Sequence, residues 1–496
     1  MSKKNLIIIG SGFAALSAAC FLAKDGYKVT VLEKNDQPGG RARQLKIDGF
    51  TFDMGPSWYW MPDVFERFFN QFNKTVADYY ELKRLDPSYR IYWQNEETDV
   101  PADYTSLKKL FESIEPGSGE KLDLFLQEAS YKYKTGMQNL VYKPSLSISE
   151  FIDVDLIKGI FKLDVFTSIK KHISKYFKHP HIQQMLEFPV LFLGAVPEKI
   201  PALYSLMNYA DIKEGTWFPK GGMYSVVDAI YKLAIELGVQ FQFNKNVIKI
   251  EVDNNLATKV IAENIDGSTS IYNADVVIAN ADYHHTEKKL LKEEFRNYSE
   301  AYWNKKTMAP SCILYYVGMN KKLQNISHHS LFFDTSFKQH AEEIYNTKQW
   351  PADPLFYVSA TSVTDNSLAP NGCENLFFLI PVAAALKDDT EELREFYFDK
   401  IVTRFEKRIN QTIRKNIIVK KSYAYSNFVN DYNAYKGNAY GLANTLIQTA
   451  ILKPSMRNKK IKNLFYTGQL TVPGPGVPPA IISGEVVAKY VIKLLG

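Results

Sequence analysis

A glycine-rich turn between a buried strand and a helix stands at the start of the chain and restricts its fold more than any other feature. Residues 6–9 form a short apolar run, which is typical of a parallel strand covered on both faces. The motif G-x-G-x-x-A follows at residues 10–15, and the small apolar residues 16–23 predict a helix. A second apolar strand, residues 28–32, runs directly into Glu33. This order of strand, turn, helix, strand and acidic residue predicts a Rossmann-type α/β unit that binds a dinucleotide.

The small residues of this turn each have a physical role in holding a dinucleotide. Gly10 permits the tight turn, Gly12 lets a pyrophosphate approach the backbone, and Ala15 allows close packing of helix on strand. The free N–H donors and the positive dipole end of the helix attract the pyrophosphate. Glu33 is expected to accept hydrogen bonds from the ribose hydroxyls. The cofactor-binding residues predicted from this unit are Gly10, Gly12, Phe13, Ala14, Ala15, Glu33 and Lys34.

The residues after Glu33 favour FAD over NAD as the cofactor. A G-G-R motif ends at Arg41, and D-G-F-x-F-D-x-G follows over residues 48–55. This pair of motifs resembles the amine oxidase and carotenoid desaturase group of FAD proteins, whereas NAD dehydrogenases do not continue in this way. Bare backbone at Gly40 suits the flavin diphosphate and ribityl chain, and Arg41 suits a cationic partner; an ordinary hairpin with a surface arginine is the alternative. The predicted contacts are Gly40, Arg41, Gly55, Pro56 and Ser57.

A loop rich in proline and glycine near the other end of the chain predicts the second half of the cofactor site. It spans residues 468–479, and the uncharged run 480–484 that follows predicts a helix. We expect the two loops to close around one flavin. The helix after Pro479 then points its positive end at the ring edge that becomes negative on reduction. The predicted contacts here are Gly468, Gly476, Val477 and Pro478.

The remaining pattern predicts how the chain divides into domains. A length of 496 residues exceeds one ordinary core, so we expect two or three domains. Helical periodicity punctuated by proline and glycine predicts a mostly helical insertion in the middle of the chain, and apolar runs at 312–318 and 376–381 predict antiparallel strands. The expected units are an FAD-binding domain (1–80, 215–300 and 440–496), a helical substrate- or membrane-facing region (81–214) and a substrate domain with an antiparallel sheet (301–439).

Composition and charge argue against several other classes of protein. The net charge of +6 comes without a dense Lys/Arg block, so we expect no nucleic-acid partner. The three cysteines are far apart and the eight histidines lack metal-ligand spacing, so we expect no disulfide framework and no metal, in a reducing cytoplasm. Glycines 10 and 12 interrupt the N-terminal apolar run, and no stretch approaches the roughly 18 to 20 apolar residues of a membrane span, so we expect no membrane anchor.

Two features of the middle of the chain allow more than one interpretation. In residues 155–178, apolar side chains alternate with lysines at helical spacing, and the nearly uncharged run 185–193 follows. Such a helix rests either on an anionic membrane surface or against the core with a solvated lysine face. The 31 Phe and 31 Tyr residues likewise fit either a large core or an aromatic tunnel for an apolar ligand.

The motifs together resemble the bacterial-type phytoene desaturases of the carotenoid desaturase and isomerase family over essentially the whole chain. The most specific is the closing motif G-x-x-T-x-P-G-x-G-x-P at residues 468–478. Gln469 and Pro479 depart from the usual family pattern, which puts the ribityl contacts of that loop in doubt. The resemblance implies a Rossmann-type FAD domain, a discontinuous α+β substrate domain and a helical insertion that contacts the membrane. It also implies that Val247 offers backbone hydrogen bonds to the adenine.

The same resemblance implies the activity. Such enzymes remove hydrogen from allylic single bonds of a C40 polyene, so the expected substrate is phytoene and the expected product direction is lycopene. The resemblance also implies peripheral attachment to the inner face of the cell membrane. The absence of a second dinucleotide motif indicates oxygen or membrane quinone as electron acceptor. No catalytic base is assigned, and the oligomeric state is left open.

Four other readings remain at this point. A hydroxycarotenoid 3,4-desaturase or a carotene isomerase shares the motifs of the family. An amine oxidase shares the Rossmann unit and the flavin. A non-catalytic protein that binds prenyl lipids shares the fold without redox chemistry.

Overall fold

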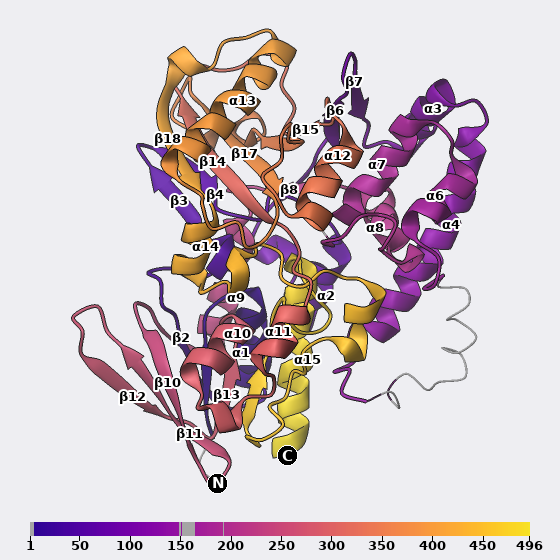
Figure 1. The fold of residues 1–496 in the computed structure, drawn as a ribbon. Coiled ribbons are helices and arrows are strands. Elements are labelled where there is room, and N and C mark those ends of the chain that lie inside the picture. The colour runs from indigo at the N-terminus through magenta and orange to yellow at the C-terminus, as the bar shows by residue number, and fades with distance from the viewer. Residues whose placement is uncertain (1–3, 148–149, 151–163, 192) are drawn as a thin grey trace.

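The computed structural model describes residues 4–147, 150, 164–191 and 193–496. Figure 1 shows three regions: a parallel sheet with its helices, where both chain ends lie, a large antiparallel sheet above it, and a group of helices to one side. The apolar–lysine pattern expected over residues 155–178 therefore lies partly outside the described residues.

A five-stranded parallel sheet brings the two ends of the chain together. Its order is β19-β13-β1-β2-β9, and every neighbouring pair is parallel. The strands are β1 (Asn5–Ile9), β2 (Lys28–Leu32), β9 (Gln240–Gln242), β13 (Val276–Ala279) and β19 (Leu464–Tyr466). Helix α9 (Tyr224–Glu236) shares a buried apolar cluster with this sheet and with the helices at both chain ends. The predicted Rossmann-type α/β class is thereby confirmed.

The first and last long helices, α1 (Phe13–Lys24) and α15 (Val477–Leu495), pack with their backbones nearly in contact. A Cβ added to Gly484 would lie 2.2 Å from the carbonyl oxygen of Ala14, so only glycine fits there. The Ser17 hydroxyl donates to the Ile481 carbonyl at 2.7 Å. Helix α15 begins at Val477, which corrects the expected start after Pro479. Proline is tolerated in a first helical turn because N–H groups there lack an intrahelical partner.

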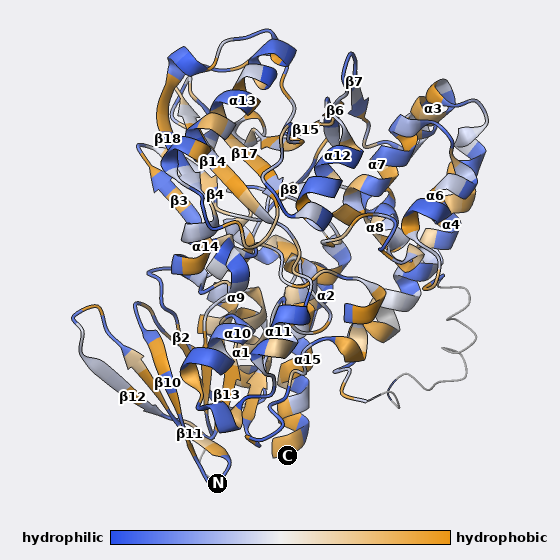
Figure 2. Ribbon diagram, viewed as in Figure 1, coloured by the Kyte–Doolittle hydropathy of each residue, from blue (hydrophilic) through white to orange (hydrophobic). Residues whose placement is uncertain are grey.

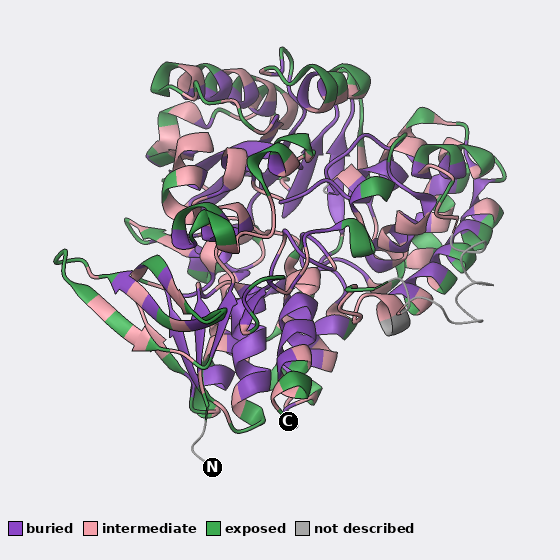
Figure 3. Cartoon of the chain, turned by 60° about the horizontal axis from the view of Figure 1, so that its bottom comes forward, coloured by how far each residue is buried: buried purple, intermediate pink, exposed green. Residues whose placement is uncertain are grey.

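A three-stranded antiparallel sheet projects from this region. It consists of β10 (Asn246–Asp253), β11 (Leu256–Glu263) and β12 (Thr269–Asn273), in that order. Figure 3 shows its outer strands mostly as intermediate or exposed, in contrast to the buried parallel strands. Its inner end matters for the site, because Val247 of β10 is buried against the parallel sheet.

A seven-stranded mixed sheet forms the other large layer. Its order is β18-β14-β17-β16-β15-β6-β7. The strands are β18 (Ile417–Tyr423), β14 (Ser311–Met319), β17 (Glu374–Val382), β16 (Phe356–Ser359), β15 (His329–Phe332), β6 (Tyr89–Tyr92) and β7 (Glu97–Val100). The predicted antiparallel strands are confirmed, with Cys312 opposite Pro381, and β14 is largely hydrophobic (Figure 2). Helix α13 (Glu391–Ile409) covers one face, where Phe398 contacts Tyr315.

The segment expected to be helical, residues 81–214, begins with strands instead. Strand β5 (Leu82–Arg84) pairs with β8 (Trp217–Pro219), and β6 and β7 form an edge hairpin of the seven-stranded sheet. The residues of β6 are aromatic, β-branched or arginine, which fit a pleated surface, and the assignment of 81–214 as a helical region did not allow for this pattern. Helices follow only from residue 104: α3 (Tyr104–Ile114), α4 (Ser118–Thr135), α6 (Ile169–Tyr176), α7 (Pro180–Leu191) and α8 (Leu206–Tyr209).

Helix α6 answers the question of the lysine-rich helix for its described part. Ile169, Ile173 and Phe177 are fully buried, whereas Lys171 and Lys175 are exposed. Figure 2 shows this alternation of hydrophobic and hydrophilic residues along α6. The core-facing interpretation therefore holds for the apolar side chains of α6 and for Phe177, whereas Phe166, which precedes the helix, is 80% exposed. Among the described residues, no helix is long and apolar enough to cross a membrane.

The remaining named elements are short and connect these layers. They are β3 (Gln44–Ile47), β4 (Phe50–Asp53), α2 (Pro62–Asn70), α10 (Tyr283–His285), α11 (Glu300–Lys305), α12 (Phe337–Ala341) and α14 (Tyr425–Tyr432).

Replacing Gly484 by alanine is expected to destabilise the fold by roughly 1 to 3 kcal/mol, because the added methyl group must push α15 away from the Ala14 carbonyl. Denaturant unfolding of the two proteins measures the difference. The matched control is Gly119→Ala in α4, where the nearest neighbour of the new methyl is the flexible end of Glu112 at 3.3 Å and the Lys108 carbonyl lies at an ordinary contact distance of 3.6 Å. That control should be neutral or stabilising by up to about 1 kcal/mol. Equal stability of Gly484→Ala and wild type would contradict the close-packing argument.

Candidate functional site

One cavity of about 610 Å³ joins the two glycine-rich loops to the seven-stranded sheet. This volume lies within the usual range of ligand sites. Its wall contains these residues predicted from the sequence: Gly10, Gly12, Phe13, Ala14, Glu33, Lys34, Gly40, Arg41, Gly55, Pro56, Ser57, Val247, Gly468, Gly476, Val477 and Pro478. Ala15 is instead fully buried in α1, where it supports helix packing. Direct contact between any of these residues and a cofactor stays a prediction.

The start of α1 has the form of an anion site. Gly12 precedes the helix, and no side chain caps its first N–H groups, while Phe13 and Ala14 face the cavity. Gly10 has a φ of 90°, which only glycine adopts readily. A Cβ on Gly40 would lie 3.4 Å from the Gly12 Cα, so the two loops meet through their backbones. Uncapped helix donors beside bare backbone fit a dinucleotide pyrophosphate.

Glu33 is positioned by two neighbours that sequence reasoning did not consider. One carboxylate oxygen accepts from the Ser11 N–H at 2.8 Å and from its hydroxyl at 2.6 Å. The other accepts from the Asn35 N–H and side-chain amide, both at 2.9 Å. A carboxylate offers about four lone-pair sites, so these bonds use them all. A ribose hydroxyl must therefore displace one of the two side-chain donors to bind Glu33.

Arg41 is a cation on the cavity wall with few partners of its own. Its Nη2 reaches only the Asn438 carbonyl at 3.4 Å, and its buried Nε has no hydrogen-bond partner among the described residues. Burial lowers the pKa of Arg41, and nearby Asp282 opposes that shift. A Cβ on Gly55 would lie 2.4 Å from the Arg41 carbonyl, which fixes this part of the backbone. An under-used guanidinium fits the predicted diphosphate partner.

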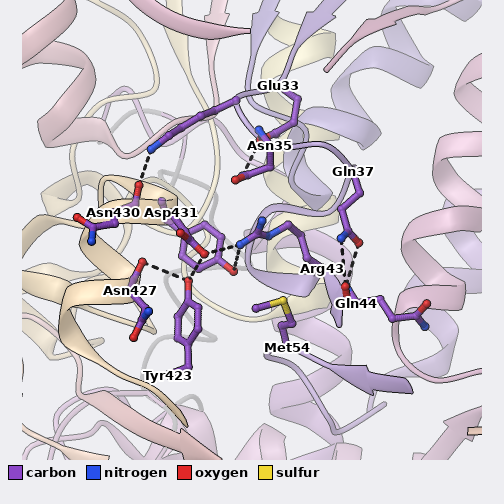
Figure 4. Close-up of polar contacts among 12 residues, drawn as sticks. Glu33, Asn35, Gln37, Arg43, Gln44, Met54, Tyr423, Asn427, Asn430 and Asp431 are labelled. Atoms are coloured by element: carbon purple, nitrogen blue, oxygen red, sulfur yellow. Dashed lines mark hydrogen bonds and ion pairs between the residues drawn. The ribbon is translucent and has the colours of Figure 1, made fainter. Parts of the chain in front are cut away.

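Behind Arg41, a polar cluster joins the first domain segment to α14. Arg43 Nη2 lies 2.6 Å from Asp431 Oδ2, and the Tyr423 hydroxyl donates to the same oxygen at 2.9 Å (Figure 4). Lys34, predicted to bind cofactor, donates to the Asn430 carbonyl of α14. The Lys34 ammonium is therefore committed to protein backbone and holds α14 beside the cavity.

The closing loop, which is the Pro/Gly-rich segment 468–479, is held by hydroxyl groups near the start of α15. Ser483 Oγ accepts from the Gly468 N–H at 3.0 Å and bonds Thr471 Oγ1 at 3.2 Å. The prolines at 478 and 479 have no N–H, and the Ala480 N–H bonds the Gly476 carbonyl. Val477 therefore supplies the N–H donor that this turn offers to the cavity.

Gln469, the departure from the family pattern, has a structural role. Its side-chain amide donates to Asn438 Oδ1 at 3.0 Å, and the same oxygen accepts the Gly441 N–H at 2.8 Å. A Cβ on Gly441 would lie 3.0 Å from the Gln469 carbonyl. Gln469 thus fastens the closing loop to the turn at 438–441.

Aromatic rings form the wall of the cavity farther from the glycine loops. Trp58 stacks on His329 with ring centroids 4.0 Å apart, and it also contacts Trp60 and Phe188 at 5.2 Å. The His329 Nδ1 lies 2.6 Å from the Tyr357 hydroxyl, and burial lowers the pKa of this histidine well below its ordinary value, so the ring is neutral. Stacked neutral rings make a rigid apolar surface suited to a conjugated or aliphatic chain.

The described acidic side chains on the cavity wall are already engaged. Glu33 holds Ser11 and Asn35, and Asp431 holds Arg43 and Tyr423. The third, Asp282, accepts the N–H groups of His285 at 3.2 Å and Tyr435 at 3.1 Å.

Histidine 340 on the same wall is also satisfied. Its Nδ1 accepts the Leu355 N–H at 2.7 Å, so its Nε2 carries the hydrogen and donates to the Pro381 carbonyl at 3.0 Å. Burial lowers the pKa of His340 to about 4. None of these four groups is a free general base.

One cluster has the residue types of a metal site. The ligand atoms of Glu128, Asp164 and His172 lie within 4.8 Å of one another. The Lys132 ammonium lies 3.6 Å from Asp164 Oδ2 and 3.5 Å from His172 Nε2. A fixed positive charge at this distance competes with a metal ion, so the expectation of no metal stands as a prediction.

Sequence reasoning missed the parts of the wall that come from isolated loop residues. Asn280 follows β13, and its side-chain amide donates to the Thr467 carbonyl at 3.2 Å. Tyr432 ends α14 and Asn444 lies in a loop, and neither belongs to a motif. Only Asn280 carried a signal, because it directly follows a buried parallel strand and ligands gather at the carboxyl ends of such strands.

The profile of the flavin-containing amine oxidoreductases matches residues 13–492. The chain therefore belongs to the flavin-containing amine oxidoreductase family. The cavity residues fit a flavin dinucleotide, because uncapped donors, bare glycine backbone and an unpaired guanidinium nitrogen meet there. A flavin is the cofactor that the family implies.

Two similar proteins show which members of this large family the chain resembles. The chain is 40% identical over 495 residues to a carotenoid 3,4-desaturase of Haloarcula japonica, covering 99% of each. It is 29% identical over 501 residues to a zeta-carotene-forming phytoene desaturase of Myxococcus xanthus, covering 98% of this chain and 93% of the relative. These relatives confirm the resemblance to carotenoid desaturases. A solved putrescine oxidase structure, 13% identical with a TM-score of 0.59 over 99% of each chain, shares the fold.

Glu33→Gln is expected to weaken flavin binding by roughly 10- to 100-fold. The new amide turns an N–H₂ group toward the Ser11 or Asn35 donors, and hydrogen bonds to a charged group contribute about 1.5 to 3 kcal/mol. Flavin fluorescence quenching measures the dissociation constant. Glu81→Gln, which changes an exposed carboxylate 3.5 Å from Lys220, is the control and should bind flavin normally. Unchanged affinity in Glu33→Gln would show that Glu33 does not organise the ribose end.

Proposed function

We propose that this protein is an FAD-dependent carotenoid desaturase that introduces a double bond into a C40 polyene. Similarity to carotenoid desaturases along the whole chain carries this proposal, and the aromatic cavity beside the dinucleotide loops supports it. The higher identity to the 3,4-desaturase favours, as substrate, a carotenoid that still has a single bond at its 3,4 position. Phytoene, expected from the motifs, is the second candidate and is favoured by the phytoene desaturase relative.

A bound flavin would supply a hydride acceptor, and the loss of a hydride from one carbon of a CH–CH pair and of a proton from its neighbour would leave the new double bond. The chain supplies orientation and a dry surface. Trp58, Phe188 and their neighbours hold the polyene and exclude water from it. Arg41 and the start of α1 hold the diphosphate.

Most candidate proton acceptors on the cavity wall are already engaged. Among the described residues, the acidic side chains and His340 there are committed to other partners. His285 also lies on the wall, and burial lowers its pKa to about 4, so its ring is neutral. We therefore assign the proton to water at the cavity edge or to the ring of His285. The two electrons leave the enzyme to oxygen or a membrane quinone, and the one dinucleotide motif found in the sequence supports that choice.

The exposed 445–452 segment and the apolar nature of the substrate together support a membrane-facing surface. This segment has no ionisable side chain, and its large apolar side chains are exposed to 42% at Leu446, 75% at Ile447 and 49% at Leu452. Gln448 anchors it, with its amide bonding the Thr307 backbone at 2.9 and 3.0 Å. A rigid exposed apolar turn has the properties of a lipid-contacting surface.

Two further features support this surface. Asn444, one residue before the segment, lies on the cavity wall. The Lys306 ammonium donates to the Leu452 carbonyl at 3.2 Å, which places positive charge beside the apolar turn and suits anionic lipid. We propose that the 445–452 segment rests on the inner face of the cell membrane and that the substrate enters near it.

The proposed activity is tested with purified protein, FAD and liposomes that carry either phytoene or a carotenoid with a long conjugated chain that is still saturated at its 3,4 bond. A 3,4-desaturase should convert the second substrate to a product absorbing at longer wavelength and leave phytoene nearly unchanged. Conversion of phytoene instead supports the second candidate. The proposal fails if neither carotenoid changes, and hydrogen peroxide release from amines under the same conditions would indicate an amine oxidase.

The membrane surface is tested by Ile447→Asp, which places a charge on the most exposed apolar side chain of the segment. Co-sedimentation with anionic liposomes should fall at least several-fold, because a charged residue at the interface loses the transfer free energy of a buried isoleucine. The control is Phe396→Asp on α13, which changes a 56% exposed ring in another region. Equal loss in both variants, or none in Ile447→Asp, would contradict the assigned surface.

A further inference from the structure

Lys453 is a buried lysine directly behind the closing loop. It is 4% exposed, and its ammonium donates to Asn444 Oδ1 at 2.8 Å. Asn444 forms part of the cavity wall. A Cβ added to Gly474 would lie 3.3 Å from Lys453 Nζ and 3.2 Å from Asn444 Oδ1. The ammonium and the amide therefore both lie against the backbone of the closing loop.

The ammonium of Lys453 lacks a counter-ion. Among the described residues, the charged side chain that acts on it is Lys306, another cation. Burial, and then repulsion by Lys306, lowers the pKa of Lys453 to about 7. A buried charge without an opposite charge is strongly unfavourable, so a nearby anion would stabilise the charged form of Lys453.

The redox function of the site supplies such an anion. A flavin gains negative charge at one edge of its ring system when it is reduced, and a nearby charge tunes its electronics. The start of α15 contributes only about half a charge, and Pro478 and Pro479 remove two of its N–H donors. A full positive charge behind the loop supplements that weak helix end.

We propose that Lys453 is a positioning residue that acts through Asn444 and the closing loop to stabilise the reduced form of the bound flavin. The oxygen of Asn444 accepts from Lys453, so its N–H₂ group is left to face Gly474 and the cavity. The ammonium polarises that amide, and fixed dipoles in a water-poor site act strongly on developing charge. This inference rests on flavin binding and not on which carotenoid is desaturated.

The main experiment measures the reduction potential of the bound flavin in wild type and in Lys453→Met, by anaerobic titration against a reference dye. Affinity for reduced relative to oxidised flavin is expected to fall about 10-fold or more, as when an opposite charge is removed from a buried ionised group. The potential should therefore become more negative. Lys306→Gln is the matched control. It removes repulsion, so Lys453 should keep its proton to higher pH and the potential should not fall.

A second measurement uses the protein without flavin. Because the pKa of Lys453 is lowered in the folded chain and ordinary in the unfolded chain, the unfolded chain binds more protons between about pH 7 and 10. Wild-type stability should therefore rise over this range, and Lys453→Met should lack that part of the rise. If Lys453→Met fails to fold, Asn444→Asp replaces it as the test variant for the reduction potential. Its carboxylate pairs with Lys453 and should also make the potential more negative.

Each readout can overturn the inference without reference to any carotenoid. Equal flavin potentials in wild type and Lys453→Met, at normal flavin content, show that the ammonium does not act on the cofactor. Equal pH dependence of stability in the two proteins without flavin shows that Lys453 is not held as an uncompensated buried amine. Loss of carotenoid turnover in Lys453→Met with an unchanged flavin reduction potential likewise counts against the proposed role of Lys453.

Discussion

The architecture depends on the backbone contact between the first and last long helices. Gly484 lets α15 approach the Ala14 carbonyl, and the Ser17 hydroxyl ties the two helices at Ile481. This contact, with parallel pairing of β1, β13 and β19, sets the glycine turn, Asn280 and the closing loop at the carboxyl ends of neighbouring strands. Ligands of open parallel sheets bind at that edge, so one packing contact assembles a site from both ends of the chain.

The charges around the cavity follow an uneven pattern. Its carboxylates accept hydrogen bonds from neighbouring groups, whereas Arg41 Nε has no hydrogen-bond partner among the described residues. Asp282 is the acidic group that acts on Arg41, and the described charge that acts on Lys453 is another cation, Lys306. These under-used cations suit a cofactor that carries phosphates and gains a further charge on reduction. The substrate side is different, because Trp58 on the wall stacks on the neutral ring of His329. One cavity thus combines a polar half at the glycine loops with an apolar half at the aromatic rings.

Local sequence was sufficient where a fixed spacing has one structural solution. The turn at 10–15, Glu33 and the 468–478 motif predicted the parallel sheet and the glycine-rich part of the cavity wall. Local sequence was insufficient where the role of a residue depends on a partner far away in the chain. Nothing near Lys453 indicates that it will lie against Gly474, and Ser11 and Asn35 carry no sign of filling the Glu33 carboxylate. The β6–β7 hairpin was missed because its pairing partner, β15, lies more than two hundred residues later.

The arrangement of the parallel sheet also determines the order in which the site forms during synthesis. Strand β19, the closing loop and α15 follow α1 by more than 400 residues, so they leave the ribosome much later. Until then β13 has an unpaired edge and α1 lacks the helix that covers it. The turn at Gly12 also lacks the loop with which it shares the cavity. The site therefore closes late, and the exposed sheet edge before it closes is the stage most open to aggregation.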